Sequence, residues 1–182
     1  MISLDYILDV DGFLLNWYAQ FCFHTGQEIK DKLPFWDLKK CGYEYDWKEI
    51  SKELTYYNGL EPMVDYRDIN FNVYAYLTGC PKDFKEWRMD DLRNNGFPPA
   101  EVICTYQKIP VLKRFIAEGL NIVMIDDKPD FVKRCLDENI PCLQFYPSYA
   151  DWEIISSDFL VYEASAIQLV AQAAAKKYNW YG

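Results

Sequence analysis

Four short stretches of the chain carry groups that could take part in phosphoryl chemistry. In chain order they are Asp9-Val10-Asp11-Gly12, Thr78-Gly79, Lys108 and Asp126-Asp127. Carboxylates can serve as a nucleophile, as a general acid or base, and as ligands of a divalent cation. A hydroxyl, a backbone amide and an ammonium group can hold phosphate oxygens. Together the four stretches supply the groups that phosphoryl transfer requires.

The first stretch has two acids on either side of one residue, followed by glycine. Asp9 at a strand end could attack phosphorus to form an aspartyl-phosphate, and Asp11 could protonate the leaving oxygen and then activate water. Gly12 permits a sharp turn, so that both side chains face the same space. The alternative is an ordinary surface turn, because the motif is short and common. A calcium loop is disfavoured, since its glycine is at position six and Gly12 is fourth from Asp9.

Phosphate donors are expected at the next two stretches. The Thr78 hydroxyl and the Gly79 amide could bond a phosphate oxygen, although a Thr-Gly pair is also an ordinary strand exit. Lys108 lies just before an expected helix start, where an ammonium group can neutralise phosphate charge. Lys113 is the alternative, but it should face elsewhere on the helix. A solvated surface lysine is the default for either.

The fourth stretch places two adjacent acids after an apolar strand. Such acids are costly there unless something positive binds them, and Mg²⁺ prefers oxygen ligands. Asp126 and Asp127 are therefore candidate metal ligands. The alternative for Asp127 is the N-cap of a helix that begins near Pro129.

The elements that would position these residues follow from short apolar runs and helix signals. Strands are predicted at residues 6–10, 73–77, 102–105, 122–125 and 142–145. Helices are predicted at 14–23, 46–55, 82–95, 110–119, from 129 onward and at 164–177. This alternation predicts an α/β fold with a doubly wound, mostly parallel sheet and right-handed crossovers. Open α/β sheets place their sites at the carboxyl ends of the strands.

Residues 27–66 interrupt the alternation and are rich in Lys, Glu, Trp and Tyr. We expect them to form a small helical cap over the sheet edge, with Asp46 as the N-cap of its helix. Residues 1–26 and 67–182 would then form the α/β core.

Composition limits the class of protein. The chain has 182 residues, 51% of them hydrophobic, which fits one domain with a small insertion. Its net charge of −9 disfavours a long nucleic-acid partner. Six cysteines without a CxxC pair indicate buried free thiols, and His24, the single histidine, is expected near a helix end. With no signal-peptide pattern, and no membrane-spanning length at 159–175, we expect a cytoplasmic protein without a membrane partner.

The order of the four motifs resembles that of haloacid dehalogenase-type phosphatases, over about residues 4–146. Two-component receivers use similar residues, but their paired acids come first and their lysine last. Within the superfamily, residues 125–130 are similar to the IDDxPD segment of 5′-deoxyribonucleotidase-like members. Residues 77–81, residues 95–98 and the insertion between the first two motifs also fit that branch.

The resemblance implies a Rossmann-like core and a role for each motif position. Asp9 would be the nucleophile and Asp11 the acid and base. Phosphate would be held by Thr78, Gly79 and Lys108. Mg²⁺ would be bound by the Asp9 side chain, the Asp11 backbone carbonyl and Asp126, with Asp127 assisting.

The sequence therefore predicts a Mg²⁺-dependent phosphomonoesterase for a small ester, by resemblance a nucleoside 5′-monophosphate. Aromatic residues such as Trp17, Phe35, Trp36 and Tyr45 could stack on a base, although such residues are more often core. One alternative is a nucleic-acid end (3′) phosphatase, which the net charge disfavours. Another is a catalytically idle module that binds a phosphorylated ligand.

Overall fold

One parallel sheet forms the centre of the molecule, as a computed structural model describes it over residues 2–181. Its strand order is β3-β2-β1-β4-β5-β6, and every neighbouring pair is parallel. The strands are β1 (Asp5–Leu8), β2 (Val73–Thr78), β3 (Glu101–Cys104), β4 (Ile122–Asp126), β5 (Cys142–Phe145) and β6 (Leu160–Val161). The five predicted strands are confirmed. The two-residue β6 was missed because so short a run shows no periodicity.

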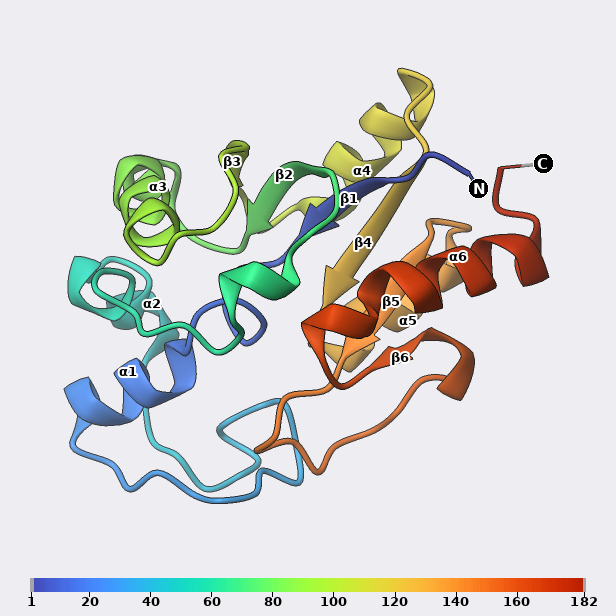
Figure 1. Cartoon of the computed structure of the whole chain (residues 1–182). Helices are drawn as coiled ribbons and strands as arrows, with labels where there is room; N and C mark the ends of the chain where they lie inside the picture. The colour runs from blue at the N-terminus through green and yellow to red at the C-terminus, as the bar shows by residue number, and fades with distance from the viewer. Residues whose placement is uncertain (1, 182) are drawn as a thin grey trace.

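Helices cover both faces of the sheet, which confirms the doubly wound α/β class. They are α1 (Trp17–Thr25), α2 (Trp47–Ile50), α3 (Lys85–Asn94), α4 (Lys108–Ala117), α5 (Pro129–Asp137) and α6 (Ile167–Tyr178). Side chains of α4 and α5 pack in one apolar cluster, and side chains of α3 and α6 pack in the other. Figure 1 shows α6 in front of the strands and α4 behind them.

Successive residues of the central strands enter opposite clusters. Tyr6 and Leu8 of β1 lie in the cluster of α3 and α6, whereas Ile7 lies in that of α4 and α5. This is the side-chain alternation of a strand buried on both faces. A shift of one residue would exchange the two faces, so the alternation fixes the register between β1 and its neighbour β4. The register in turn sets which residues lie at the ends of the two strands.

Residues 27–66 have little regular structure. The helix predicted at 46–55 is only α2, followed by a short 3₁₀ helix (Leu54–Tyr56). Glu53 adopts an extended backbone, with φ −91° and ψ 110°, and this separates the two. The Asp46 cap is confirmed, since its carboxylate accepts a hydrogen bond from the Lys48 amide at 2.8 Å.

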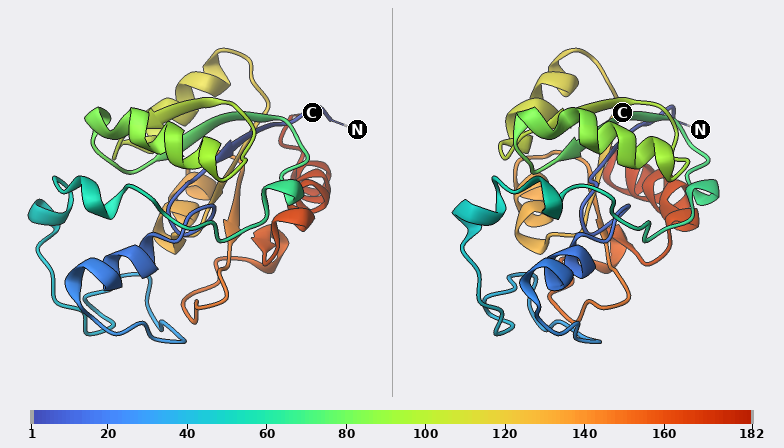
Figure 2. Two further views of the ribbon diagram at one scale, coloured as in Figure 1. Left: turned by 60° about the vertical axis from the view of Figure 1, so that its left-hand side comes forward. Right: turned by 90° about the vertical axis from the view of Figure 1, so that its left-hand side faces the viewer.

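The first part of the insertion packs with α1 and with the loop after β5, whereas its Tyr57 and Leu60 join the apolar cluster on one face of the sheet. The cluster of the first part includes Phe21 of α1, Leu33 and Tyr43 of the insertion, and Trp152. Both views in Figure 2 show the light-blue and cyan part of the insertion, up to α2, beside α1, on the side of the molecule away from α4. The boundaries at 27 and 66 stay a prediction.

All six cysteines are free and buried, as predicted. His24 lies in the last turn of α1, as predicted. Among residues 2–181, none of the helices has the length and apolarity that crossing a membrane requires.

Candidate active site

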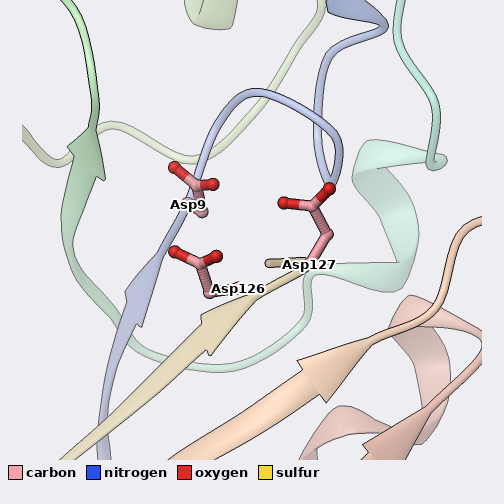
Figure 3. A group of neighbouring side chains, drawn as sticks. All are labelled: Asp9, Asp126 and Asp127. Carbon is pink, nitrogen blue, oxygen red and sulfur yellow. The ribbon is translucent and has the colours of Figure 1, made fainter. Parts of the chain in front are cut away.

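Three buried acids meet at the carboxyl ends of β1 and β4. Asp9 follows β1 directly, and its amide continues the ladder by donating to the Ile125 carbonyl at 2.9 Å. Asp126 ends β4, and Asp127 is the next residue. One carboxylate oxygen from each acid lies within 4.8 Å of the others. Figure 3 shows the three side chains gathered at the tips of these two strands.

Lys108 joins two of the acids. It is the first residue of α4, and its ammonium donates to Asp9 Oδ1 and to Asp126 Oδ2, each at 2.7 Å. Lys113, the alternative, pairs instead with Glu138, and its side chain is 56% exposed. The structure thus brings Lys108 and not Lys113 to the acids.

Asp127 is held by a close turn and by the insertion. Gly12 has φ +83°, and a Cβ at this position would lie 2.7 Å from Asp127 Cγ, so only glycine fits. On its other side, Asp127 Oδ2 accepts a hydrogen bond from Trp36 Nε1 at 2.9 Å. Asp127 is not the N-cap of α5, because Lys128 holds that position and donates its amide to Asp126 Oδ1. The N-cap interpretation is therefore wrong.

The carboxylate of Asp11 does not join the cluster of Asp9, although both residues line the same cavity. It forms an ion pair with Arg88 and accepts a hydrogen bond from Thr78 Oγ1 at 3.3 Å. Thr78 is fully buried and does not line the cavity, whereas Gly79 does. The hydroxyl expected to hold phosphate is thus used within the protein to hold Asp11.

Arg88 is the residue that the sequence analysis missed. Its guanidinium is fully buried, pairs with Asp11, and donates to the Tyr57 carbonyl at 3.3 Å. It also lies 5.1 Å from the centre of the Tyr57 ring. A signal was present, since Arg88 shares the buried face of α3 with Asp91 and Leu92, at helical spacings of three and four. Arg88 and Asp91 are three residues apart and pair at 4.0 Å on this face.

Burial and like charge dominate the electrostatics of the acids. Burial, together with the charges of Asp126 and Asp11, raises the pKa of Asp9 to about 8 despite the attraction of Lys108. Burial and the charges of Asp126 and Asp9 likewise raise the pKa of Asp127 well above its usual value. Burial alone would lower the pKa of Lys108, but Asp126 and Asp9 outweigh it and raise that pKa.

These residues fit a divalent cation. Three acids and one lysine leave two formal negative charges, because Asp11 is already paired with Arg88. Asp127 Oδ1 is buried and has no hydrogen-bond partner among residues 2–181. An unpartnered oxygen beside two further carboxylates is a set of hard donors, which suits Mg²⁺.

A cavity of about 590 Å³ opens on the acids. The acids, Gly79 and Lys108 line it, and much of its remaining wall is aromatic. Of the four aromatic residues expected to stack on a base, Trp17, Trp36 and Tyr45 line the cavity and Phe35 does not. Trp47, Tyr106 and Trp152, which the sequence did not single out, also line it.

Comparison with known proteins places the fold. No family model matches the sequence, and no curated protein matches it either. A crystal structure of a haloacid dehalogenase-like family hydrolase from Xanthomonas campestris is similar, with a TM-score of 0.53 and 17% identity. The match covers 96% of this chain and 98% of that one. The chain therefore has the fold of this hydrolase, as the motif order predicted.

A second similar structure is that of β-phosphoglucomutase from Clostridium difficile. It has a TM-score of 0.48 and 14% identity, and the match covers 98% of this chain and 100% of that one.

Proposed function

We propose that this protein is a Mg²⁺-dependent phosphomonoesterase that hydrolyses a small phosphate ester through an aspartyl-phosphate on Asp9. One observation carries the proposal. A buried carboxylate, bonded to a half-buried lysine and next to two further acids, lines a cavity at the carboxyl edge of a parallel sheet. This is where such sheets present reacting groups.

In the first step, a carboxylate oxygen of Asp9 attacks phosphorus, and the bond from phosphorus to the ester oxygen breaks. Lys108 orients Asp9 through Oδ1, and its ammonium is placed to stabilise charge on the transferring phosphoryl group. The leaving oxygen takes a proton from Asp11, and the product alcohol departs.

In the second step, water attacks the phosphorus of the aspartyl-phosphate, and the bond from phosphorus to Asp9 breaks. Asp11 accepts the proton of the attacking water, and inorganic phosphate is released. Asp11 Oδ2 is the oxygen suited to these transfers. It has only the 3.3 Å contact with Thr78, whereas Oδ1 is held by Arg88.

Asp9, Asp126 and Asp127 would hold the cation through side chains, with the Asp11 carbonyl as the further ligand that the family resemblance implies. When bound, Mg²⁺ would neutralise charge on the phosphoryl oxygens and orient the ester. The insertion and the aromatic walls would limit the access of water.

We infer that the ester is a nucleoside 5′-monophosphate, in line with the 5′-deoxyribonucleotidase-like motif. Trp17, Trp47 and Tyr106 line the cavity, and a base would stack on aromatic side chains of this kind. A cavity of about 590 Å³ lies within the range of small-ligand sites. Hydrolysis of phosphates at nucleic-acid ends, and ligand binding without hydrolysis, are the alternative outcomes of the test.

The test is a phosphate-release screen with Mg²⁺ over nucleoside monophosphates, sugar phosphates and phosphorylated oligonucleotides. Asp9→Asn should abolish turnover at nearly constant volume, because the amide is not a nucleophile. Asp5→Asn, at the other end of β1, is the matched control and should retain activity. Wild-type rates in Asp9→Asn would refute the proposal, and binding without turnover in the native chain would favour the idle module.

Removal of metal gives a second check. EDTA should silence hydrolysis, and added Mg²⁺ should restore it, because the excess acid charge needs a cation. The measurement is the initial rate of phosphate release before and after dialysis against chelator. Full activity in the metal-free protein would contradict the Mg²⁺ part of the proposal.

A further inference from the structure

The insertion reaches the acid cluster through one side chain. Trp36 lies in the irregular part of residues 27–66, and its Nε1 donates to Asp127 Oδ2 at 2.9 Å. Asp127 is buried, with 3% of its surface exposed. The contact joins residues that are 91 positions apart in the sequence.

The chemistry of this donor suits a residue behind a metal ligand. An indole N–H is neutral and donates one hydrogen bond. It therefore fixes the orientation of the Asp127 carboxylate and leaves its negative charge in place. A lysine or arginine at this position would neutralise that charge. Oδ1, the other oxygen of Asp127, is buried and has no partner among residues 2–181, so it remains for a cation. Groups that orient ligands in this way commonly tune metal affinity.

Trp36 is itself held at its N–H edge and at its ring face by two consecutive residues. Asp127 receives its N–H, and the Lys128 ammonium lies 4.3 Å from the centre of its ring. A cation over an indole face is attracted by the ring. The residue pair at the end of β4 thus holds one side chain of the insertion.

The insertion is also tied to the loop after β5, close to Trp36 in the sequence. The Leu33 amide donates to the Tyr149 carbonyl, and the Asp151 amide donates to the Leu33 carbonyl, both at 2.8 Å. Lys32 adds a bond from its ammonium to the Ser148 carbonyl at 2.8 Å. These bonds fix the direction from which the indole approaches Asp127.

We propose that Trp36 is a positioning residue of the metal site, so that docking of the insertion and binding of the cation strengthen each other. This inference rests on the metal site of the proposed function. Coupling of this kind is reciprocal: if docking raises the affinity for Mg²⁺, then Mg²⁺ holds the insertion docked by the same factor. No substrate is needed for either effect.

The first experiment measures Mg²⁺ binding to substrate-free protein by calorimetry. Trp36→Phe keeps an aromatic ring, although a smaller one, and removes the N–H, and we expect it to weaken Mg²⁺ binding about tenfold. Trp87→Phe is the matched control, because Trp87 has similar exposure, 41% against 39%, and does not line the cavity. It should bind Mg²⁺ like the native chain. Circular dichroism melting checks that both variants are folded.

The second experiment measures tryptic cleavage at Lys39 and Lys40, two exposed residues of the insertion. Mg²⁺ should slow cleavage in the native chain and in Trp87→Phe, and the protection should be largely lost in Trp36→Phe. Because it needs no turnover, this readout is independent of the enzymatic activity.

The outcomes separate this inference from the proposed function. Native Mg²⁺ affinity and native protection in Trp36→Phe would overturn the inference and leave the phosphatase intact. Equal weakening in Trp36→Phe and Trp87→Phe would also overturn it. Selective weakening in a protein that hydrolyses no ester would support the inference and reject the phosphatase. If the native chain binds no Mg²⁺, both the inference and the metal part of the function fail.

Discussion

Asp9 and Asp11 are two positions apart, yet each has its own cationic partner. Asp9 is bonded to Lys108 and belongs to the acid cluster, whereas Asp11 is paired with Arg88 and Thr78. Two identical side chains on one turn thereby have different surroundings, which fits the different tasks that the proposed mechanism gives them, attack on phosphorus and proton transfer. The sequence predicts both acids, but the partner of Asp11 comes from a helix more than seventy residues later.

Replacement of Arg88 by methionine tests its role at Asp11. The change leaves Asp11 without its cation, and we expect a loss of stability of about 3 kcal/mol and a fall in kcat with little change in KM. Urea unfolding and steady-state kinetics measure these effects. Arg93→Met, on the exposed side of α3, should change stability by less than about 0.5 kcal/mol. Equal effects of the two substitutions would show that Arg88 has no special role at Asp11.

Gly12 offers a second test at this scale. In Gly12→Ala the new Cβ meets the Asp127 carboxylate, so we expect Mg²⁺ affinity and activity to fall sharply. Gly119→Ala separates this contact from backbone strain. Gly119 has a similar φ of +88° but nothing within 4 Å of its Cβ, so only strain of about 1 kcal/mol is expected there. Calorimetry on both variants is decisive, and unchanged Mg²⁺ binding in Gly12→Ala would contradict the site.

Among the elements, those with a strong pattern were predictable and those set by tertiary contacts were not. The runs before Asp9, Thr78 and Asp126 identify buried strands from composition alone, and β4 is buried throughout. The helix predicted at 46–55 breaks at Glu53. Ile50 before the break and Tyr57 after it are buried in different apolar clusters. Packing in three dimensions, which no local pattern records, decides that break.

The start of α4 decides which lysine reaches the site. Five residues at about 100° each turn the direction by about 500°, so Lys113 points about 140° away from Lys108. Lys108→Met should lower kcat at least about 100-fold, because a donor to the transferring phosphoryl group is lost.

Lys113→Met is the matched change on the same helix and should retain native rates, since Lys113 pairs with Glu138 and does not line the cavity. Steady-state phosphate release measures both variants. The reverse ranking would contradict the assignment of Lys108 to the site.

At the scale of the whole molecule, charge and shape act together. The net charge of −9 is unfavourable for polyanions, while the cavity offers local cations and aromatic faces. The walls could not be assigned from sequence, because Trp152 comes from the loop after β5 and Tyr106 from the loop after β3. Only the folded chain brings them beside the insertion.

This balance of charge predicts a preference for short substrates. A mononucleotide should be hydrolysed faster than an oligonucleotide with the same terminal phosphate, because the longer chain is repelled by the protein. Added salt should reduce the difference between the two rates, because charges are screened over about 10 Å at 0.1 M ionic strength. The measurement is the ratio of kcat/KM values at low and high salt. A faster oligonucleotide would instead favour an end phosphatase.

The most direct test of the account is mass spectrometry of the acid-quenched protein during turnover of a nucleoside monophosphate. Asp11 moves a proton in both steps, so Asp11→Asn would slow formation of the intermediate as well as its hydrolysis, and the two proteins to compare are the native chain and Asp9→Asn. The account predicts one phosphoryl group on the peptide that contains Asp9 in the native chain, and none in Asp9→Asn. Phosphate release by the native chain, with no phosphoryl group on that peptide, would contradict it.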